Sequence, residues 1–258
     1  MVLADLTAGA VADAERRAID RPLAEIEKAA LSRPAAKDAV AALTPTERVK
    51  IIAEVKRASP SRGALADIPD PALQASRYET GGASAISVLT EERRFGGSLA
   101  DLEAVTARVS VPVLRKDFIA TPYQVFEARA AGADLVLLIV AGLEASVLRE
   151  LFALIQELGM TPLVETHSGD ELEQAIDLGA PLIGVNARDL TTLELDRDLF
   201  GRLAERIPES AVKIAESAVL TPEDVAHYRS AGADVVLIGE ALVTGDPVAT
   251  LKSFLEVG

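Results

Sequence analysis

The first feature of this sequence that could do chemistry is a carboxylate and an ammonium group two residues apart, Glu54 and Lys56. They end a short apolar run that is typical of a buried strand. Residues i and i+2 of a strand point to the same side, so both side chains are expected to leave the strand together. Because Ser59-Pro60-Ser61 then breaks the strand, the pair lies at a strand end, which favours a functional site.

Polar side chains also follow nearly all of the later apolar runs, and only the run that ends near Val140 lacks them. In chain order these ends carry Glu91, Glu92 and Arg93; Lys116 and Phe118; Glu165 and His167; Asn186 and Arg188; Glu216 and Ser217; and Gly239 and Glu240. Lysine can transfer a proton when its pKa is lowered, whereas arginine cannot. Lys56 and Lys116 are therefore the candidate proton donors.

The apolar runs predict eight strands, each followed by a helix. Strands are expected at 51–55, 85–90, 112–116, 135–140, 161–165, 182–186, 211–216 and 235–239. Helices are expected at 70–80, 98–108, 122–131, 144–158, 169–178, 198–205, 222–230 and 247–256. The runs show little polar alternation, which indicates parallel strands covered on both faces. Thr121-Pro122 and Thr221-Pro222 are typical helix starts.

A Gly-Ala pair precedes every second strand, at residues 82, 132, 179 and 232, which indicates a repeat of two strand–helix units. Eight such units in about 200 residues predict a (β/α)8 TIM barrel of the α/β class. A doubly wound open sheet is the alternative, but the first turn lacks its G-x-G-x-x-G pattern. Residues 1–48 are expected to form an N-terminal helical extension and 49–258 the barrel, within a single domain.

In such a barrel all strand ends meet at one mouth, where active sites are built. Taken singly, Glu91, Glu92 and Arg93 are expected to be solvated loop residues. His167 is expected to be a structural hydrogen-bonding residue, and His227 to lie on the surface of a helix. Asp134 and Asp234 precede their strands and are expected to cap turns away from the mouth. The carboxylates lack the histidine partners of a typical transition-metal site, so we expect no metal.

Composition restricts the partners of this chain. Its 26 basic and 40 acidic residues give a net charge of −14, which repels phosphate backbones and argues against nucleic acid or an anionic membrane. The chain has no cysteine, and neither a signal peptide nor a membrane-spanning run is evident, so we expect a cytoplasmic protein. No long apolar surface stripe is evident, which favours a monomer that binds a small-molecule substrate.

Eight stretches of the chain together resemble the indole-3-glycerol phosphate synthase family of tryptophan biosynthesis. They are IAEVKRASPS (52–61), SVLTEERRFGGSL (87–99), PVLRKDFI (112–119), LLIV (137–140), LVETH (163–167), IGVNARDL (183–190), IAES (214–217) and VLIGEALV (236–243). They occur in the family's order and cover nearly all of residues 51–245. The helical extension before the first strand also resembles this family, in which it covers the mouth.

The resemblance implies one reaction, without a cofactor. In 1-(2-carboxyphenylamino)-1-deoxyribulose 5-phosphate the aromatic ring closes onto the C2 carbonyl, then carbon dioxide leaves, then water leaves, and indole-3-glycerol phosphate forms. The resemblance implies that Lys116 is the acid for ring closure, where negative charge builds on the carbonyl oxygen. Dehydration needs an acid and a base; Lys56 and Glu165 are the candidates, and their assignment stays open.

The remaining candidate residues would hold the substrate. Glu54 would position Lys56, and Arg188 would join the two lysines in binding the anionic groups. The sugar and ring would be oriented by Asn186, Glu216 and Ser217. The resemblance also implies that Phe95 and Phe118 bracket the aromatic ring of the substrate or pack as part of the barrel top. It implies that Ser59 shapes the loop that carries Lys56. The backbone of Ala218, Gly239 and Glu240 would contact the phosphate.

Ala218 departs from the family pattern, which usually has Glu-Ser-Gly at this position. If the position requires a positive φ, alanine costs about 1 kcal/mol there. We therefore expect a modest loss of phosphate affinity in a working site.

Three other functions compete with this interpretation. Phosphoribosylanthranilate isomerase is the nearest barrel enzyme, but its acid–base pair often includes a cysteine, which this chain lacks. A Schiff-base aldolase could use Lys116 or Lys56. A non-catalytic barrel that binds a sugar phosphate is the third, although it would not need both Lys116 and Glu165.

Overall fold

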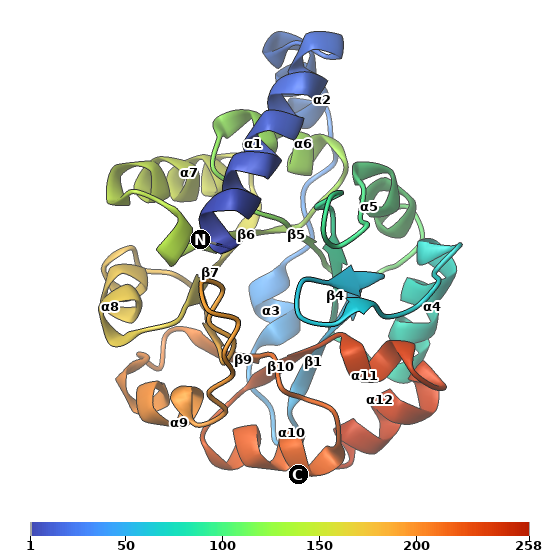
Figure 1. Cartoon of the computed structure of the whole chain (residues 1–258), viewed down its shortest axis with the longest axis vertical. Helices are drawn as coiled ribbons and strands as arrows, with labels where there is room; N and C mark the ends of the chain where they lie inside the picture. Colours follow the sequence, from blue (N-terminus) through green and yellow to red (C-terminus); the bar gives the residue numbers. More distant parts are fainter. Residues whose placement is uncertain (1, 258) are drawn as a thin grey trace.

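The computed structural model describes residues 2–257, and in them eight parallel strands close into a barrel (Figure 1). In chain order the barrel strands are β1 (Lys50–Val55), β4 (Ala85–Leu89), β5 (Val113–Lys116), β6 (Leu135–Ile139), β7 (Thr161–Thr166), β8 (Leu182–Asn186), β9 (Val212–Glu216) and β10 (Val235–Ile238). Each lies within one residue of its predicted bounds. The predicted (β/α)8 barrel is confirmed, and the open sheet is excluded.

Helices follow the strands around the outside of the barrel (Figure 1). They are α4 (Pro71–Gly81), α5 (Leu99–Thr106), α6 (Pro122–Ala130), α7 (Ala145–Glu157), α8 (Gly169–Asp177), α9 (Leu199–Leu203), α10 (Pro222–Ser230), α11 (Glu240–Val243) and α12 (Pro247–Leu255). Thr121 and Thr221 cap helices that begin with proline, as the sequence predicted, and each also forms a capping box.

The N-terminal extension consists of α1 (Val2–Asp20), α2 (Leu23–Leu31) and the short α3 (Ala39–Leu43). In Figure 1, the N-terminal end of α1 lies beside β6 and β7 at the upper edge of the barrel, and the helix runs upward from there to α2. Leu3 and Leu6 of α1 are buried in one cluster with the apolar side chains of the barrel interior, such as Leu137 and Leu237. Hydrophobic burial therefore fixes α1 over the strand ends.

Strand register brings the polar strand ends to one level. Glu165 of β7 pairs with Gly184 of β8, and two residues on, Asn186 pairs with Glu216 of β9. Side chains alternate along a strand, so residues separated by two point into the barrel together. At the opposite ends of the strands, Asp134 accepts hydrogen bonds from the backbone N–H of Val113 at 2.9 Å and of Lys37 at 2.8 Å.

Asp234 similarly accepts from the backbone N–H of Lys213, at 2.9 Å. Both aspartates therefore lie away from the mouth, as predicted, but each binds the start of the neighbouring strand and does not cap its own turn. The sequence did not predict the hairpin of β2 (Ala58–Ser59) and β3 (Gly63–Ala64), which follows β1 at the mouth. Two-residue strands carry no detectable periodicity, which explains the omission.

Among residues 2–257, no helix combines the length and apolar character needed to span a membrane.

Candidate active site

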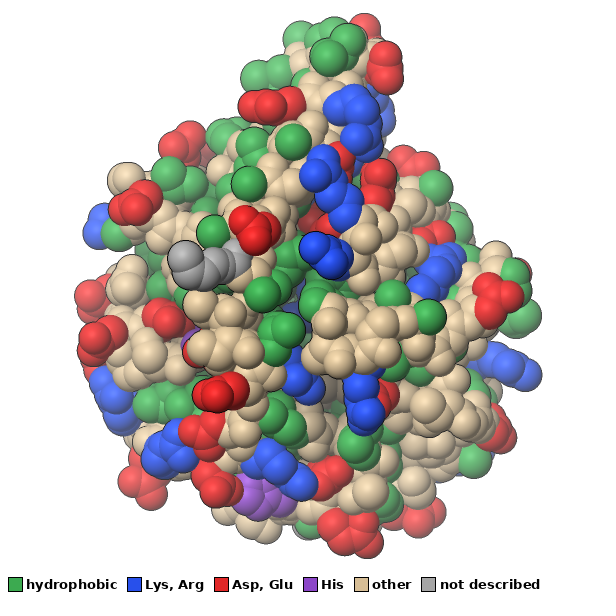
Figure 2. All heavy atoms as spheres, viewed as in Figure 1, with side chains coloured by type: hydrophobic (Ala, Val, Ile, Leu, Met, Phe, Trp, Pro, Cys, Tyr) green, Lys and Arg blue, Asp and Glu red, His purple; other side chains and the backbone are tan. Residues whose placement is uncertain are grey.

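A cavity of about 210 Å³ opens at the carboxyl ends of the strands. All candidate site residues line it: Glu54, Lys56, Ser59, Phe95, Lys116, Phe118, Glu165, Asn186, Arg188, Glu216, Ser217, Ala218, Gly239 and Glu240. On the face seen in Figure 2, basic side chains lie in and beside the central hollow of this acidic protein. The site therefore offers local positive charge to an anionic ligand.

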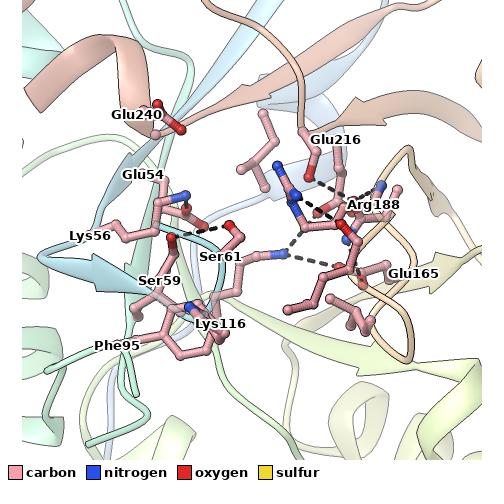
Figure 3. Close-up of a pocket in the computed structure, with 18 of the residues that line it drawn as sticks. Glu54, Lys56, Ser59, Ser61, Phe95, Lys116, Glu165, Arg188, Glu216 and Glu240 are labelled. Atoms are coloured by element: carbon pink, nitrogen blue, oxygen red, sulfur yellow. Dashed lines mark hydrogen bonds and ion pairs between the residues drawn. The ribbon is translucent and has the colours of Figure 1, made fainter. Parts of the chain in front are cut away.

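Lys116 lies at the centre of the site, between two buried carboxylates (Figure 3). Its Nζ donates to Glu165 Oε2 at 3.0 Å and to Glu216 Oε2 at 2.8 Å. Burial alone would lower the pKa of Lys116, but the carboxylates of Glu165, Glu216 and Glu54 together raise it well above its usual range. The ammonium form is thus the resting state, and the pKa shift is opposite to the lowering that eases proton transfer from lysine.

The two carboxylates that share this ammonium differ in their other partners. Glu165 Oε1 also accepts from Asn186 Nδ2 at 3.0 Å. Burial alone would raise the pKa of Glu165, but the charges of Lys116 and His167 hold it below its usual range. Glu165 is therefore the ionised member of the pair.

Glu216 is the member of the pair that more readily takes a proton. Burial, and then the neighbouring Glu165 charge, raise the pKa of Glu216 to about 8, against the opposing effect of Lys116. Among residues 2–257 no group donates a hydrogen bond to Glu216 Oε1. A Cβ atom at Gly184 would lie 2.2 Å from this oxygen, so only glycine at that position leaves room for the carboxyl group.

Glu54 and Lys56 form the second charged pair, with Nζ 2.8 Å from Glu54 Oε1. The Glu54 side chain is buried, and its Oε2 also accepts from Ser87 Oγ at 3.4 Å. A Cβ at Gly239 would come within 2.9 Å of Lys56 Nζ, so the glycine lets the pair approach the β10 backbone. The strand-end position predicted for this pair is confirmed.

Asn186 links the charged centre to the loop after β9. Its Oδ1 accepts from Ser217 Oγ at 2.7 Å and from the backbone N–H of Arg188 at 3.0 Å. Ser217 and Ala218 both have positive φ, 70° and 59°. The loop thus requires left-handed backbone at Ala218, where this chain lacks the glycine of the family pattern.

Arg188 and the two phenylalanines complete the walls. Arg188 Nη1 donates to the carbonyl of Leu193 at 3.1 Å, within the loop after β8. The rings of Phe95 and Phe118 lie side by side, with centroids 6.1 Å apart and planes tilted by 40°, so they offer one aromatic wall.

Glu240 turns toward the hairpin after β1, where its Oε1 lies 2.6 Å from Arg62 Nη2. The Oγ atoms of Ser59 and Ser61 on the same hairpin lie 3.5 Å apart (Figure 3). Gly239 and Glu240 both line the cavity.

The prediction that Glu91 is a solvated loop residue was wrong. Its carboxylate is buried and accepts from the backbone N–H groups of Arg93, Arg94 and Phe95, so it organises the loop that carries the aromatic wall. Glu92 and Arg93 are 42% and 51% exposed. Arg93 nevertheless donates twice, at 2.8 Å, to the buried Asp13 of α1, which ties this loop to the extension.

The two histidines differ in exposure, and the described residues do not group into a metal site. His227 is 42% exposed, as predicted, whereas the His167 side chain is only 9% exposed and lies beside Glu165. Within residues 2–257 no three His, Cys, Asp or Glu side chains are grouped so that they could hold a metal ion.

Solved structures with low sequence identity share this fold. The 3-hexulose-6-phosphate synthase of Salmonella typhimurium superposes with a TM-score of 0.66 and 16% identity, over 81% of this chain and 98% of that chain. The N-acetylmannosamine-6-phosphate 2-epimerase of Clostridium perfringens gives a TM-score of 0.64 and 16% identity, over 82% and 93%. At such identities the likeness shows the barrel alone.

Sequence relatives are much closer. The chain is 70% identical over 253 residues to the indole-3-glycerol phosphate synthase of Leifsonia xyli subsp. xyli, covering 98% of this chain and 97% of that protein. It is 57% identical over 258 residues to indole-3-glycerol phosphate synthase 1 of Streptomyces coelicolor, covering 100% and 96%. The family model for indole-3-glycerol phosphate synthase matches residues 3–254. This chain therefore belongs to the indole-3-glycerol phosphate synthase family.

Proposed function

We propose that the mouth of this barrel converts 1-(2-carboxyphenylamino)-1-deoxyribulose 5-phosphate to indole-3-glycerol phosphate by lysine and glutamate acid–base catalysis. Family membership makes the chain a carboxy-lyase of tryptophan biosynthesis. The observation that carries the residue roles is the position of Lys116 Nζ, 3.0 Å from Glu165 and 2.8 Å from Glu216. A protonated donor beside an ionised base suits a reaction that needs both.

Ring closure is the step assigned to Lys116. As the aromatic carbon attacks the C2 carbonyl, negative charge develops on the carbonyl oxygen, and an ammonium group stabilises and then protonates it. Lys116 is held as an ammonium by its two carboxylate neighbours. Its side chain is only 15% exposed, so water competes little for the proton.

Decarboxylation then follows from the substrate's own electronics. Ring closure leaves a positively charged iminium conjugated to the carbon that bears the carboxylate. When the carbon–carboxylate bond breaks, its electron pair neutralises that charge and restores the aromatic ring. Apolar side chains of the cavity wall, among them Phe118, Leu137 and Ile139, surround this step. Low polarity there favours conversion of a carboxylate to neutral carbon dioxide.

Dehydration requires an acid for the leaving hydroxyl and a base for a proton of the new ring. We assign the base to Glu165, because its environment keeps the carboxylate ionised. We assign the acid to Lys56, which Glu54 positions at 2.8 Å. The sequence left these two roles open, and the asymmetric surroundings of the two side chains support this choice.

Phosphate recognition is assigned to the backbone around Ala218 and Gly239, which both line the cavity. The backbone of Ala218 is left-handed, with φ of 59°. Ala218→Gly should lower KM by about twofold to fivefold, because glycine removes up to about 1 kcal/mol of left-handed strain when the N–H turns to the phosphate. Steady-state KM, with the melting temperature as a control for general stabilisation, checks this. An unchanged or higher KM would contradict it.

Substrate affinity should depend on the protonation of Glu216. Its pKa is raised to about 8, so the carboxyl group is neutral below that pH and ionised above it. Ionisation adds a negative charge to a pocket for an anionic substrate, so KM should rise as the pH passes 8. Glu216→Gln, which stays neutral, should flatten KM between pH 6.5 and 9. A parallel rise in both proteins would contradict this prediction.

We further propose that residues 1–258 act as a single-domain monomer in the cytoplasm, with a small anionic substrate, no cofactor and no nucleic-acid or membrane partner. The net charge of −14 supports the exclusion of polyanionic partners. Light scattering of the purified protein tests the monomer: a mass near 27.1 kDa is expected. A mass twice as large would contradict the proposal.

One assay tests the proposed function as a whole. The purified protein is mixed with the carboxyphenylamino substrate, and the indole product is followed by its fluorescence. Product should form without added metal or cofactor. Substrate that binds but is not turned over would instead indicate a sugar-phosphate-binding barrel, and a covalent adduct trapped by borohydride would indicate a Schiff-base enzyme.

A further inference from the structure

His167 is an ionisable residue that the mechanism above does not use. It follows the last residue of β7, and its side chain is 9% exposed. Nε2 lies 3.3 Å from Glu165 Oε1, and Nδ1 lies 3.2 Å from Glu171 Oε2. The backbone N–H of His167 also donates to Glu171 Oε2, at 2.8 Å, which holds the ring between two carboxylates.

This geometry discriminates between the protonation states of the ring. In a neutral imidazole one nitrogen carries a lone pair, and here that nitrogen would lie within 3.3 Å of a carboxylate oxygen. Among residues 2–257, Nε2 has no partner with hydrogen-bond geometry, so its interaction with Glu165 is that of a charge. Only the imidazolium interacts favourably on both sides.

The charges around the ring agree with this state. Glu165 faces it from β7, Glu171 from α8 and Asp189 from the loop after β8, and Lys116 of β5 lies on the far side of Glu165. Burial alone would lower the pKa of His167, but Glu165 and Glu171 raise it to about 10. The positive charge is then present throughout the neutral range and is lost only as the pH approaches 10.

We propose that His167 is a positioning residue whose imidazolium holds Glu165 as an anion, oriented toward Lys116 and Asn186. The charge balance of the site depends on it. With a protonated His167 and a neutral Glu216, the two cations Lys116 and His167 match the two anions Glu165 and Glu171. Without the charge on His167, Glu165 would keep only Lys116 as a cationic neighbour and would compete with Glu216 for a proton. The inference rests on the proposed role of Glu165 as a base.

The direct test is the protonation state of the ring, measured by NMR of the ring nitrogens in the wild-type protein. The chain has only two histidines, and His227→Asn assigns the signals while leaving activity unchanged. His167 should be doubly protonated at pH 7.5. In Glu171→Gln, which removes the outer carboxylate, the ring should lose its proton at lower pH than in wild type. A neutral His167 ring at pH 7.5 would overturn the proposal, whatever the activity.

The kinetic test uses His167→Gln, which keeps a polar group but removes the charge. Glu165 should then take a proton at higher pH, so kcat/KM should fall about tenfold at pH 5.5 and less than about threefold at pH 8. KM at pH 8 should stay within about twofold, because the ring lies behind Glu165. A pH profile parallel to that of wild type would mean a purely structural role and would overturn the proposal.

The two tests separate this inference from the role of Glu165. If Glu165→Gln retains full turnover, the proposed base is wrong, whereas the NMR measurement still decides whether His167 is charged. If Glu165→Gln is inactive and His167 is neutral, the base stands and the positioning role fails. If His167→Gln does not fold, the wild-type NMR measurement alone decides.

Discussion

Replacing Lys116 by arginine is expected to lower kcat about 100-fold or more, because the charge remains but the transferable proton is lost. Lys116 Nζ contacts both Glu165 and Glu216, and a guanidinium can pair with the same carboxylates. Binding should therefore be affected less than turnover. Steady-state kinetics with the indole product as the signal separate the two effects.

The matched control is Lys252→Arg, which makes the same change on the exposed part of α12. It should leave kcat and KM unchanged. The melting temperatures of both variants report whether the larger guanidinium disturbs the barrel. Turnover of Lys116→Arg near that of wild type would refute the role of Lys116 as the acid.

Replacing Glu165 by glutamine is the second change with a large expected effect, a loss of about 100-fold in kcat, because a general base contributes a factor of this order. Glutamine keeps nearly the same volume, and its carbonyl oxygen can still accept from Asn186 Nδ2, which Glu165 binds at 3.0 Å. The loss should therefore reflect the missing base. The measurement is kcat across pH 6 to 9.

The control here is Glu173→Gln on α8, whose carboxylate is 56% exposed and pairs with Arg206 at the surface. Surface pairs of this kind contribute little, so its activity and stability should match those of wild type. If Glu165→Gln retains turnover within about threefold of wild type, a group other than Glu165 removes the ring proton.

The fold was predictable because its signals are local and repeated. Parallel strands covered on both faces give uninterrupted apolar runs, and Gly-Ala pairs such as Gly132-Ala133 mark the end of a helix before the next strand. The turn glycine at 132 has φ of 92°, which explains the residue type at this point of the repeat. Each strand was placed within one residue for these reasons.

The membership of the site was also predictable, since parallel strands in a barrel must end at one mouth. Which groups on different strands pair there was not predictable, because that pairing depends on the register between strands distant in sequence. The contact of Lys116 with Glu216 joins residues 100 positions apart. Likewise, Gly184 lies within an apolar run, and only the position of the Glu216 carboxyl group reveals why a side chain there would not fit.

Glu91 shows the limit of judging strand-end charges one by one. A carboxylate in a loop has the same sequence signature whether it accepts from water or from backbone N–H groups. In the folded chain the loop of Arg93 to Phe95 wraps around Glu91, and Asp13 of the distant α1 anchors it through Arg93. The aromatic wall thus depends on the N-terminal extension.

The assignment of separate steps to Lys116 and Glu165 can be tested by following both products in a single turnover. Carbon dioxide release reports ring closure and decarboxylation, and indole fluorescence reports dehydration. The proposed mechanism predicts that Lys116→Arg slows both signals together, whereas Glu165→Gln releases carbon dioxide well before the indole product forms. Loss of both signals in parallel in Glu165→Gln would contradict the assignment of Glu165 to dehydration, and rapid carbon dioxide release by Lys116→Arg would contradict the assignment of Lys116 to ring closure.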